Sequence, residues 1–195
     1  KSSQKFMVSF EEKFQSELKD LKEYIALATV DAKNYQETNL KIIKHLTQHD
    51  NIPGVYVTLN KPFNTLISLF EKKGVDTRLI IFIDAVTKIS SGEMGKKDNC
   101  LFIGNPENLS DISVAMDQAV RAIRGKEKFL FFDSLSTLLV YNKATTVARF
   151  IHFLASKMRS WQVKGIIISL RKESDQELIN ELSQIVDVLI DLGGE

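Results

Sequence analysis

Seven short apolar segments, separated by stretches with helical spacing, constrain the fold of this chain most strongly. The segments are YIALATV (24–30), GVYVTL (54–59), RLIIFID (78–84), CLFIG (100–104), KFLFFD (128–133), GIIISL (165–170) and VDVLID (186–191). Most are apolar at nearly every position, which is typical of strands that are covered on both faces in a parallel sheet. Parallel strands need helical crossovers, so the sequence predicts a sheet sandwiched between helices.

The stretches between these segments place apolar residues at helical spacing. In 109–125, LSDISVAMDQAVRAIRG, they recur every three or four positions, and Gly125 stands where a helix would stop. SDQE at 174–177 is typical of a capping box at the start of a helix, and Pro62 suits a first helical turn. Helices are therefore predicted over 35–49, 62–74, 109–125, 143–161 and 174–185.

The chain has enough apolar material for one compact core. With 195 residues, of which 44% are hydrophobic, a single domain over 24–195 is expected. Residues 1–23 carry apolar side chains near heptad spacing and are expected to form an amphipathic helical segment that packs on the body or meets a partner. SSGEMGKKDN (90–99) is predicted to be an exposed loop. Because the chain begins at Lys1 rather than methionine, we expect it to be part of a longer protein.

Charge and cysteine content exclude several classes of protein. The 26 basic and 25 acidic residues leave a net charge of +1, which does not support a large field directed at nucleic acid or a membrane. One cysteine cannot form an internal disulfide, no signal segment stands at the start, and the apolar segments are too short to cross a bilayer. A cytoplasmic location without membrane contact is expected.

Three strand segments deliver an aspartate to the carboxyl end of a strand, where α/β proteins usually bind their ligands. Asp31 follows the first segment, and Asp84 and Asp133 close the third and the fifth. In FLFFDSLSTLL (129–139) the acid precedes a hydroxyl, as in a Walker-B strand that holds magnesium beside a nucleotide. The ordinary alternative is that such an aspartate caps the next helix or turn.

From about Gly54 onward, the order of segments resembles the RecA-superfamily ATPase domains of the KaiC-like type, which are widespread in archaea. The resemblance is carried by GVYVTL, LFIGNPENLSDISVAMDQAVRAI, KFLFFDSLSTLLVY, ARFIHFLASKMRSWQVKGIIISLRKES and LSQIVDVLIDL. Its most specific part is DSLSTLL, directly after the Walker-B-like strand. The resemblance implies a RecA-like three-layer α/β/α fold with a mostly parallel central sheet.

The chain departs from this family at the position of the catalytic base. In the family, the strand that corresponds to 54–59 ends in a pair of glutamates that activate the attacking water, whereas this chain has Asn60 and Lys61. An amide does not accept a proton usefully at neutral pH, and a lysine is normally already protonated, so neither residue replaces a carboxylate base.

The second departure is the phosphate loop. The motif G-x-x-x-x-G-K-[ST] needs glycines to turn backbone N–H groups toward phosphate, a lysine to neutralise charge and a hydroxyl to bind magnesium. When the motif is aligned on AKNYQETN (32–39), Thr38 replaces the lysine and Asn39 replaces the hydroxyl. No glycine occurs over 24–53, and Lys33 is a nearby substitute charge.

A self-capped helix start is predicted in place of the phosphate loop. Asn34 and Glu37 have the spacing of a capping box, and the Glu37 carboxylate would also repel a triphosphate. ATP hydrolysis is therefore expected to be lost, tight ATP binding with it, and neither a cofactor nor a catalytic residue is predicted. If ATP and magnesium are weakly retained, Asp133 is the candidate metal ligand, and the degenerate nucleotide-site positions are Asp133, Ser134, Lys33, Thr38 and Asn39.

The histidines and the cysteine have ordinary interpretations. His45 and His49 lie four residues apart on a predicted helix, a spacing that can bind zinc. No cysteine or carboxylate partner stands at a recognisable metal spacing, so these two residues and His152 are expected to be surface histidines. Cys100 begins an apolar strand and is expected to be buried.

The acids and hydroxyls at the strand ends have two further interpretations. The three aspartates would hold magnesium together in a receiver domain, but the paired acids and the lysine typical of that fold are absent. Ser134, Ser136 and Thr137 have no adjoining histidine, which argues against a nucleophile.

Two basic segments are further candidates for binding. Arg171 and Lys172 lie where RecA-like domains often carry residues that sense nucleotide or touch a neighbouring subunit. The other segment is expected to be a solvated face, or a phosphate-binding surface as in RecA relatives that handle DNA. Its residues are Arg121, Arg124, Lys126 and Lys128.

Three hypotheses about function follow. The leading one is a catalytically inactive RecA/KaiC-like domain that acts as a regulatory or protein-interaction module in archaeal signal transduction, as a monomer or dimer because the nucleotide that supports ring assembly is missing. The second is an unconventional nucleotide-binding protein or ATPase that uses Asp133 with Lys33 and Arg171. The third, a nucleic-acid accessory factor related to inactive recombinase paralogs, rests on the basic segment that contains Arg121.

Overall fold

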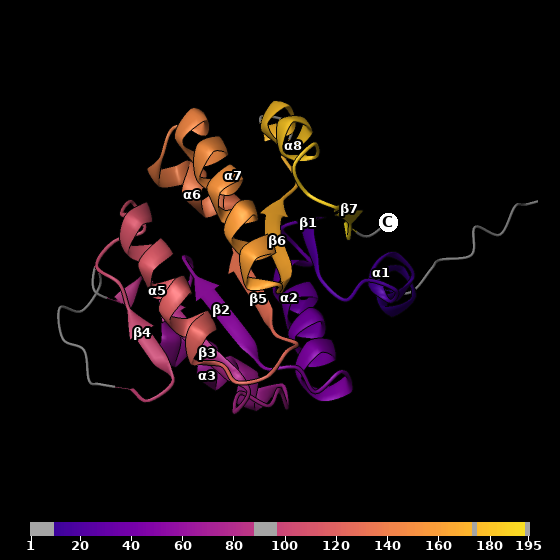
Figure 1. Cartoon of the computed structure of the whole chain (residues 1–195), viewed down its shortest axis with the longest axis vertical. Helices are drawn as coiled ribbons and strands as arrows, with labels where there is room; N and C mark the ends of the chain where they lie inside the picture. The colour runs from indigo at the N-terminus through magenta and orange to yellow at the C-terminus, as the bar shows by residue number, and fades with distance from the viewer. Residues whose placement is uncertain (1–9, 88–96, 173–174, 194–195) are drawn as a thin grey trace, which may run out of the picture.

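The computed structural model describes residues 10–87, 97–172 and 175–193, and these residues contain a central seven-stranded sheet (Figure 1). Each predicted apolar segment overlaps one of the strands, because a segment that is apolar throughout is stable only where both faces are covered. The strands are β1 (Tyr24–Val30), β2 (Gly54–Thr58), β3 (Ile80–Asp84), β4 (Cys100–Phe102), β5 (Phe129–Asp133), β6 (Lys164–Leu170) and β7 (Val188–Asp191).

The strands lie in the order β4-β3-β2-β5-β6-β1-β7, and every pairing between them is parallel. The central strands β2 and β5 are buried along their whole length. Their carboxyl ends meet in register, since Thr58 pairs with Asp133 on one side and with Asp84 on the other. The sheet therefore brings the polar residues that end β2, β3 and β5 to a single edge, called the carboxyl edge below.

Helices cover both faces of the sheet and complete the predicted three-layer α/β/α architecture. One core contains residues of α5, α6, α7 and α8, and the other contains residues of α1, α2 and α3. Figure 1 shows α5 and α7 crossing the face of the sheet that belongs to the first of these cores. The helices are α1 (Phe10–Leu18), α2 (Tyr35–Lys44), α3 (Phe63–Lys72), α5 (Leu109–Ala122), α6 (Leu135–Tyr141), α7 (Ala144–Trp161) and α8 (Gln176–Leu182).

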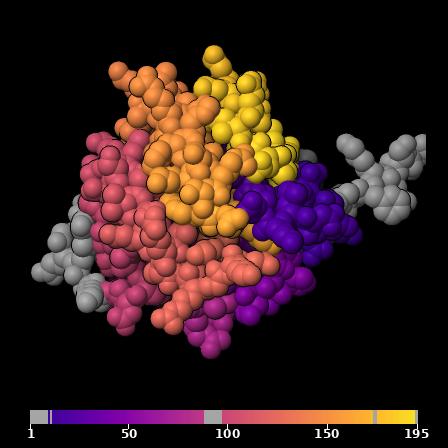
Figure 2. All heavy atoms as spheres, viewed as in Figure 1, coloured from indigo at the N-terminus to yellow at the C-terminus, as the bar shows by residue number. Residues whose placement is uncertain are grey.

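Helix α1 occupies the middle of the predicted amphipathic segment and packs on the body. Phe14 and Leu18 are 3% and 4% exposed, and the Phe14 ring meets the His45 ring edge to face at 5.5 Å. In Figure 2, α1 lies against the C-terminal segment that contains β7. The apolar side chains of α1 therefore contribute to the second core rather than to a free surface.

The predicted helix over 35–49 is divided into two kinds of turn. Helix α2 ends at Lys44, and the π-helical turn η1 (His45–His49) follows, with the Asp50 N–H donating to the His45 carbonyl at 3.0 Å. The Thr47 hydroxyl donates to the Ile43 carbonyl at 2.8 Å, and such side-chain bonds compete with helix hydrogen bonds. The wider turn changes the directions of His45 and His49.

Three predictions fall partly outside the described residues. These are residues 1–9 of the predicted amphipathic segment, most of the loop over 90–99 and Ser174 of the SDQE capping box. Among the described helices, none combines the length and the apolar character that a membrane span needs.

Candidate functional site

Asp133, the aspartate of the Walker-B-like strand, is buried at the carboxyl edge and surrounded by polar side chains. Its Oδ1 accepts from Asn60 Nδ2 at 2.8 Å, and its Oδ2 accepts from the Tyr56 hydroxyl at 2.6 Å and from Asn39 Nδ2 at 3.4 Å. No lysine or arginine of the described residues forms an ion pair with it. Burial without a cation raises the pKa of Asp133 from 3.8 to about 8, so its carboxyl is mostly neutral at pH 7.

Asn60 stands where the resemblance to KaiC-like domains places the catalytic glutamates, and it lies over Asp133 at the carboxyl edge. Its Nδ2 lies 2.7 Å from the Tyr35 hydroxyl as well as 2.8 Å from Asp133, and its Oδ1 accepts from the Thr137 hydroxyl. Beside it, Lys61 Nζ donates to Gln36 Oε1 at 2.9 Å. These contacts connect the segment after β2 with α2, β5 and α6, and no carboxylate base stands among them.

The cavity beside Asp133 measures only about 10 Å³. One water molecule needs roughly 10 to 15 Å³, so a phosphate group, which is larger than water, does not fit. A neutral carboxyl is also a poor magnesium ligand, because Mg²⁺ binds carboxylates in their charged form. The residues present do not fit a magnesium–nucleotide complex. The cavity is lined by Tyr35, Gln36, Asn39, Leu40, Tyr56, Lys61, Leu66, Leu69, Phe70 and Asp133.

The predicted capping box at the start of α2 is wrong. Asn34 has helical backbone angles (φ −103°, ψ −5°), and its side chain makes no capping hydrogen bond. A capping residue normally has extended angles that direct its side chain back to the N–H groups of the first turn. Glu37 instead pairs with Lys41 at 3.3 Å, one helical turn further on.

The degenerate nucleotide-site positions on and before α2 separate in space. Thr38 and Asn39 are buried, and Asn39 contacts Asp133. Lys33 lines a different cavity, of about 410 Å³, on the outer side of α2. That cavity is lined by Lys33, Gln36, Glu37, Leu40, Lys41, Lys44, Lys73 and Val75.

Arg171 lies with acids of the neighbouring strands rather than with Asp133. Its guanidinium is 3.3 Å from Asp31 and also pairs with Asp191, which ends β7. The exposed ion pairs join the carboxyl ends of β6, β1 and β7. Asp133, Lys33 and Arg171 therefore take part in three separate sets of contacts.

The three strand-end aspartates do not converge on one ion. One strand separates Asp133 from Asp84, which lies in register with it, so the two are about 10 Å apart across the sheet. Asp31 is farther from Asp133, because it lies three residues beyond Ala28, the β1 residue in register with Asp133. Asp84 is fully buried, and its carboxylate accepts the N–H groups of Phe63 at 2.7 Å, Val86 at 2.7 Å and Thr87 at 2.8 Å. For Asp84, the ordinary interpretation of a cap for a helix and a turn is confirmed.

The hydroxyls of DSLSTLL hold α6 in place. Ser134 Oγ accepts from the Thr137 N–H at 3.2 Å and caps α6. Ser136 Oγ accepts from the Leu170 N–H at 2.7 Å and connects α6 with the end of β6. All three hydroxyl residues, with Thr137 bonded to Asn60, are therefore used in structural contacts.

Much of the predicted basic segment is engaged within the chain. Arg121 pairs with Asp117 at 2.6 Å, and Lys128 Nζ donates to the Val120 and Ile123 carbonyls at the end of α5. Arg124 and Lys126 are exposed beside them. These contacts hold Lys128 against the end of α5 and offset the charge of Arg121 with that of Asp117, but the Arg121 side chain stays 73% exposed.

The prediction for Cys100 is confirmed, whereas the prediction for His45 and His49 missed a carboxylate partner. Cys100 is buried as predicted, and burial, with the nearby charge of Asp84, raises the pKa of its thiol to about 12. His45 and His49 do have a carboxylate partner, because Asp50 contacts both imidazoles. Sequence spacing did not reveal this cluster, since it depends on the π-helical turn.

Comparison with known proteins gives a family model and a fold. A model described as "Family of unknown function (DUF7504)" matches residues 45–192. Among solved structures, the chain is similar to the KaiC-like protein PH0186 from the hyperthermophilic archaeon Pyrococcus horikoshii OT3, with 17% identity and a TM-score of 0.62 over 88% of this chain and 74% of that one. No curated protein matches. The structural likeness confirms the predicted RecA-like fold.

Proposed function

We propose, from the premise that this chain belongs to the family of unknown function DUF7504 and has a RecA-like fold, that it is a catalytically inactive KaiC-like domain. In this proposal it acts in the cytoplasm as a regulatory or protein-interaction module, in a process such as archaeal signal transduction. The fold is kept as a scaffold, and the nucleotide site is closed.

The observation that carries the proposal is the closed carboxyl edge. Asn60 donates to both Asp133 and the Tyr35 hydroxyl, and only about 10 Å³ remains beside the Asp133 carboxyl. Opening the edge for a triphosphate would break these bonds, and the buried Asp133 carboxyl would lose its Asn60 partner, which costs about 1 to 3 kcal/mol. This cost opposes nucleotide binding before any contact with phosphate is made.

The chemistry of the remaining residues supports the loss of hydrolysis independently. Asn60 cannot accept a proton from water, and a neutral Asp133 does not attract magnesium. The positions of Lys33 and Arg171 give little support to the unconventional nucleotide site, because neither contacts Asp133 among the described residues. A monomer or dimer fits a domain without interfacial nucleotide.

Calorimetric titration of the chain with Mg-ATP and with Mg-ADP tests this proposal. We expect no saturable binding up to about 1 mM nucleotide and no phosphate release above that of buffer. The proposal fails if either nucleotide binds with a micromolar dissociation constant, or if phosphate release is steady and is abolished by Asp133→Ala. In that case, Lys33→Ala and Arg171→Ala identify which cation serves the site.

Nucleic-acid binding is tested separately. The net charge of +1, the pairing of Arg121 with Asp117 and the contact of Lys128 with the end of α5 lead us to expect no DNA binding at low salt. Salt-dependent binding that the double variant Arg121→Glu and Arg124→Glu weakens would instead support a nucleic-acid accessory factor. Fluorescence anisotropy with a labelled duplex and a labelled single strand measures both possibilities.

A further inference from the structure

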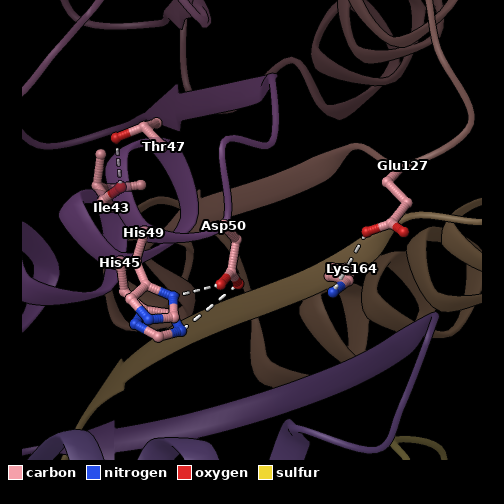
Figure 3. Close-up of polar contacts among 7 residues, drawn as sticks. All are labelled: Ile43, His45, Thr47, His49, Asp50, Glu127 and Lys164. Atoms are coloured by element: carbon pink, nitrogen blue, oxygen red, sulfur yellow. Dashed lines mark hydrogen bonds and ion pairs between the residues drawn. The ribbon is translucent and has the colours of Figure 1, made fainter.

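A second polar site lies at the opposite edge of the sheet from Asp133. It is formed where η1 ends and where β1 and β6 begin, beside a cavity of about 460 Å³. Two histidines and an aspartate face one another here, and the Glu127–Lys164 ion pair lies across from them (Figure 3). The cavity is lined by Phe14, Gln15, Leu18, Lys19, Tyr24, His45, His49, Asp50, Ile52, Glu127 and Lys164.

The donor atoms of the three side chains already lie close enough together for a metal-binding triad. His49 Nδ1 is 2.8 Å from Asp50 Oδ1, and His45 Nε2 is 3.5 Å from Asp50 Oδ2. One donor atom from each residue lies within 4.8 Å of the other two. Donors on a tetrahedral zinc with bonds near 2.1 Å are separated by about 3.4 Å. Because the two rings stack nearly in parallel, both imidazoles must turn out of the stack before their nitrogen lone pairs point at one ion.

The backbone explains why these side chains meet. The π-helical turn places the rings of His45 and His49 almost parallel, 4.7 Å apart at an interplanar angle of 13°. The Asp50 N–H donates to the His45 carbonyl, which fixes the residue that carries the carboxylate directly after the turn. Single π-helical turns occur often at functional sites in other proteins, and this one aligns the donors on one side.

We propose that His45, His49 and Asp50 bind a divalent transition-metal ion, with Zn²⁺ as the preferred ion. Two imidazole nitrogens and one carboxylate suit zinc and its neighbours in the first transition row, whereas Mg²⁺ and Ca²⁺ prefer all-oxygen sites. Three protein ligands leave a fourth position, which a water molecule fills on the side of the cavity. The site is separate from the closed carboxyl edge and does not depend on the proposed function.

The ion would also connect two parts of the chain. The Phe14 ring of α1 packs on the His45 ring, so fixing His45 restrains the surface on which α1 lies. Because zinc binds the folded turn and the unfolded chain lacks this geometry, binding should raise the melting temperature.

Zinc titration of the metal-free chain, prepared without a histidine tag, tests the site. We expect one Zn²⁺ per chain with a micromolar dissociation constant, measured by competition with a zinc-sensitive dye. Losing a direct ligand should weaken binding at least as much as losing a residue that only hydrogen-bonds to a ligand, so His49→Ala and Asp50→Ala should each raise the dissociation constant about tenfold or more. His152→Ala is the matched control, because the chain has three histidines and this exposed one lies beside Glu181 on α8. It should bind zinc as the unaltered chain does.

Two further measurements keep the outcome clear. His45 is packed against α1, so its variant can lose stability, whereas the His49 side chain is 67% exposed and its replacement should leave the circular-dichroism spectrum and melting temperature of the metal-free chain unchanged. Bound Co²⁺ should give visible absorption bands of a four-coordinate site that His49→Ala abolishes. Zinc binding that is absent, or that is equal in the unaltered chain and in His49→Ala, overturns the proposal.

Discussion

Replacing Asp133 with asparagine is expected to stabilise the domain at pH 8 and to remove most of the decline in stability between pH 4 and pH 8. Burial raises the pKa of Asp133 from 3.8 to about 8. Between these values the unfolded chain has lost the proton and the folded chain still holds it. The free energy of unfolding therefore falls as pH rises, by about 1.4 kcal/mol for each pH unit at most, and it levels off above pH 8. Asparagine is neutral at every pH, so the variant lacks this pH-dependent decline in the free energy of unfolding.

The environment of Asp133 already suits a neutral group. The buried Oδ1 of Asn39 has no hydrogen-bond partner among the described residues, and Asn39 lies next to Asp133 Oδ2. A protonated carboxyl brings a donor to this position, and a rotation of the Asn39 amide would let its oxygen accept it. An asparagine amide brings a donor too, and the Tyr56 hydroxyl, which now donates to Asp133 Oδ2, would then accept from it. The substitution should consequently preserve the packing.

Urea unfolding of both proteins at several pH values from about 5 to 9 measures the effect. Asp117→Asn is the control, because its side-chain hydrogen bonds with Arg121 and Trp161 lower the pKa of Asp117. Its titration lies below this range, so the decline should persist in the control. A stability of the unaltered chain that rises with pH over this range would mean that Asp133 is ionised in the folded state.

Replacing Asp84 with alanine is expected to destabilise the domain by about 3 to 5 kcal/mol, the range seen when a buried charged group with several hydrogen bonds is lost. The Asp84 carboxylate accepts three backbone N–H groups, those of Phe63, Val86 and Thr87, and also the Thr87 hydroxyl. Alanine leaves the buried donors unpaired, and the start of α3 and the turn after β3 lose their shared cap.

Chemical denaturation followed by circular dichroism measures the loss for Asp84→Ala. Asp111→Ala provides the matched control, since Asp111 is likewise an aspartate at the start of a helix, in the first turn of α5, but is exposed. Its replacement should cost about 1 kcal/mol or less. Equal losses for the two variants would contradict the role assigned to the buried carboxylate.

The sequence predicted the architecture well because burial on both faces leaves a strong compositional signal. Segments such as GVYVTL and KFLFFD are apolar throughout, and only a central strand of a covered sheet satisfies that pattern. The resemblance to KaiC-like domains rested on these same segments. For this reason the strands, the parallel sheet and the RecA-like fold could all be predicted from the sequence alone.

The polar contacts were harder to predict from the sequence because they join residues that are distant in sequence. Nothing local to Asn60 indicates that its amide will reach Tyr35, 25 residues earlier, and Asp133, 73 residues later. The Asn34 cap was predicted from residue type, but backbone angles decide capping. The meeting of His45 with Asp50 required a π-helical turn, which spacing rules for α-helices do not anticipate.

The contacts of Asn60 have a consequence for how information could pass through such a module. Asn60 ties the segment after β2 to α2, β5 and α6 with the chain's own side chains. A ligand changes a protein's shape only when it binds two conformations with different affinity, and under the proposed function no nucleotide binds here to do so. The carboxyl edge would then present the same surface at any ratio of ATP to ADP. A partner would respond to the amount of this protein in the cell rather than to the energy charge of the cell.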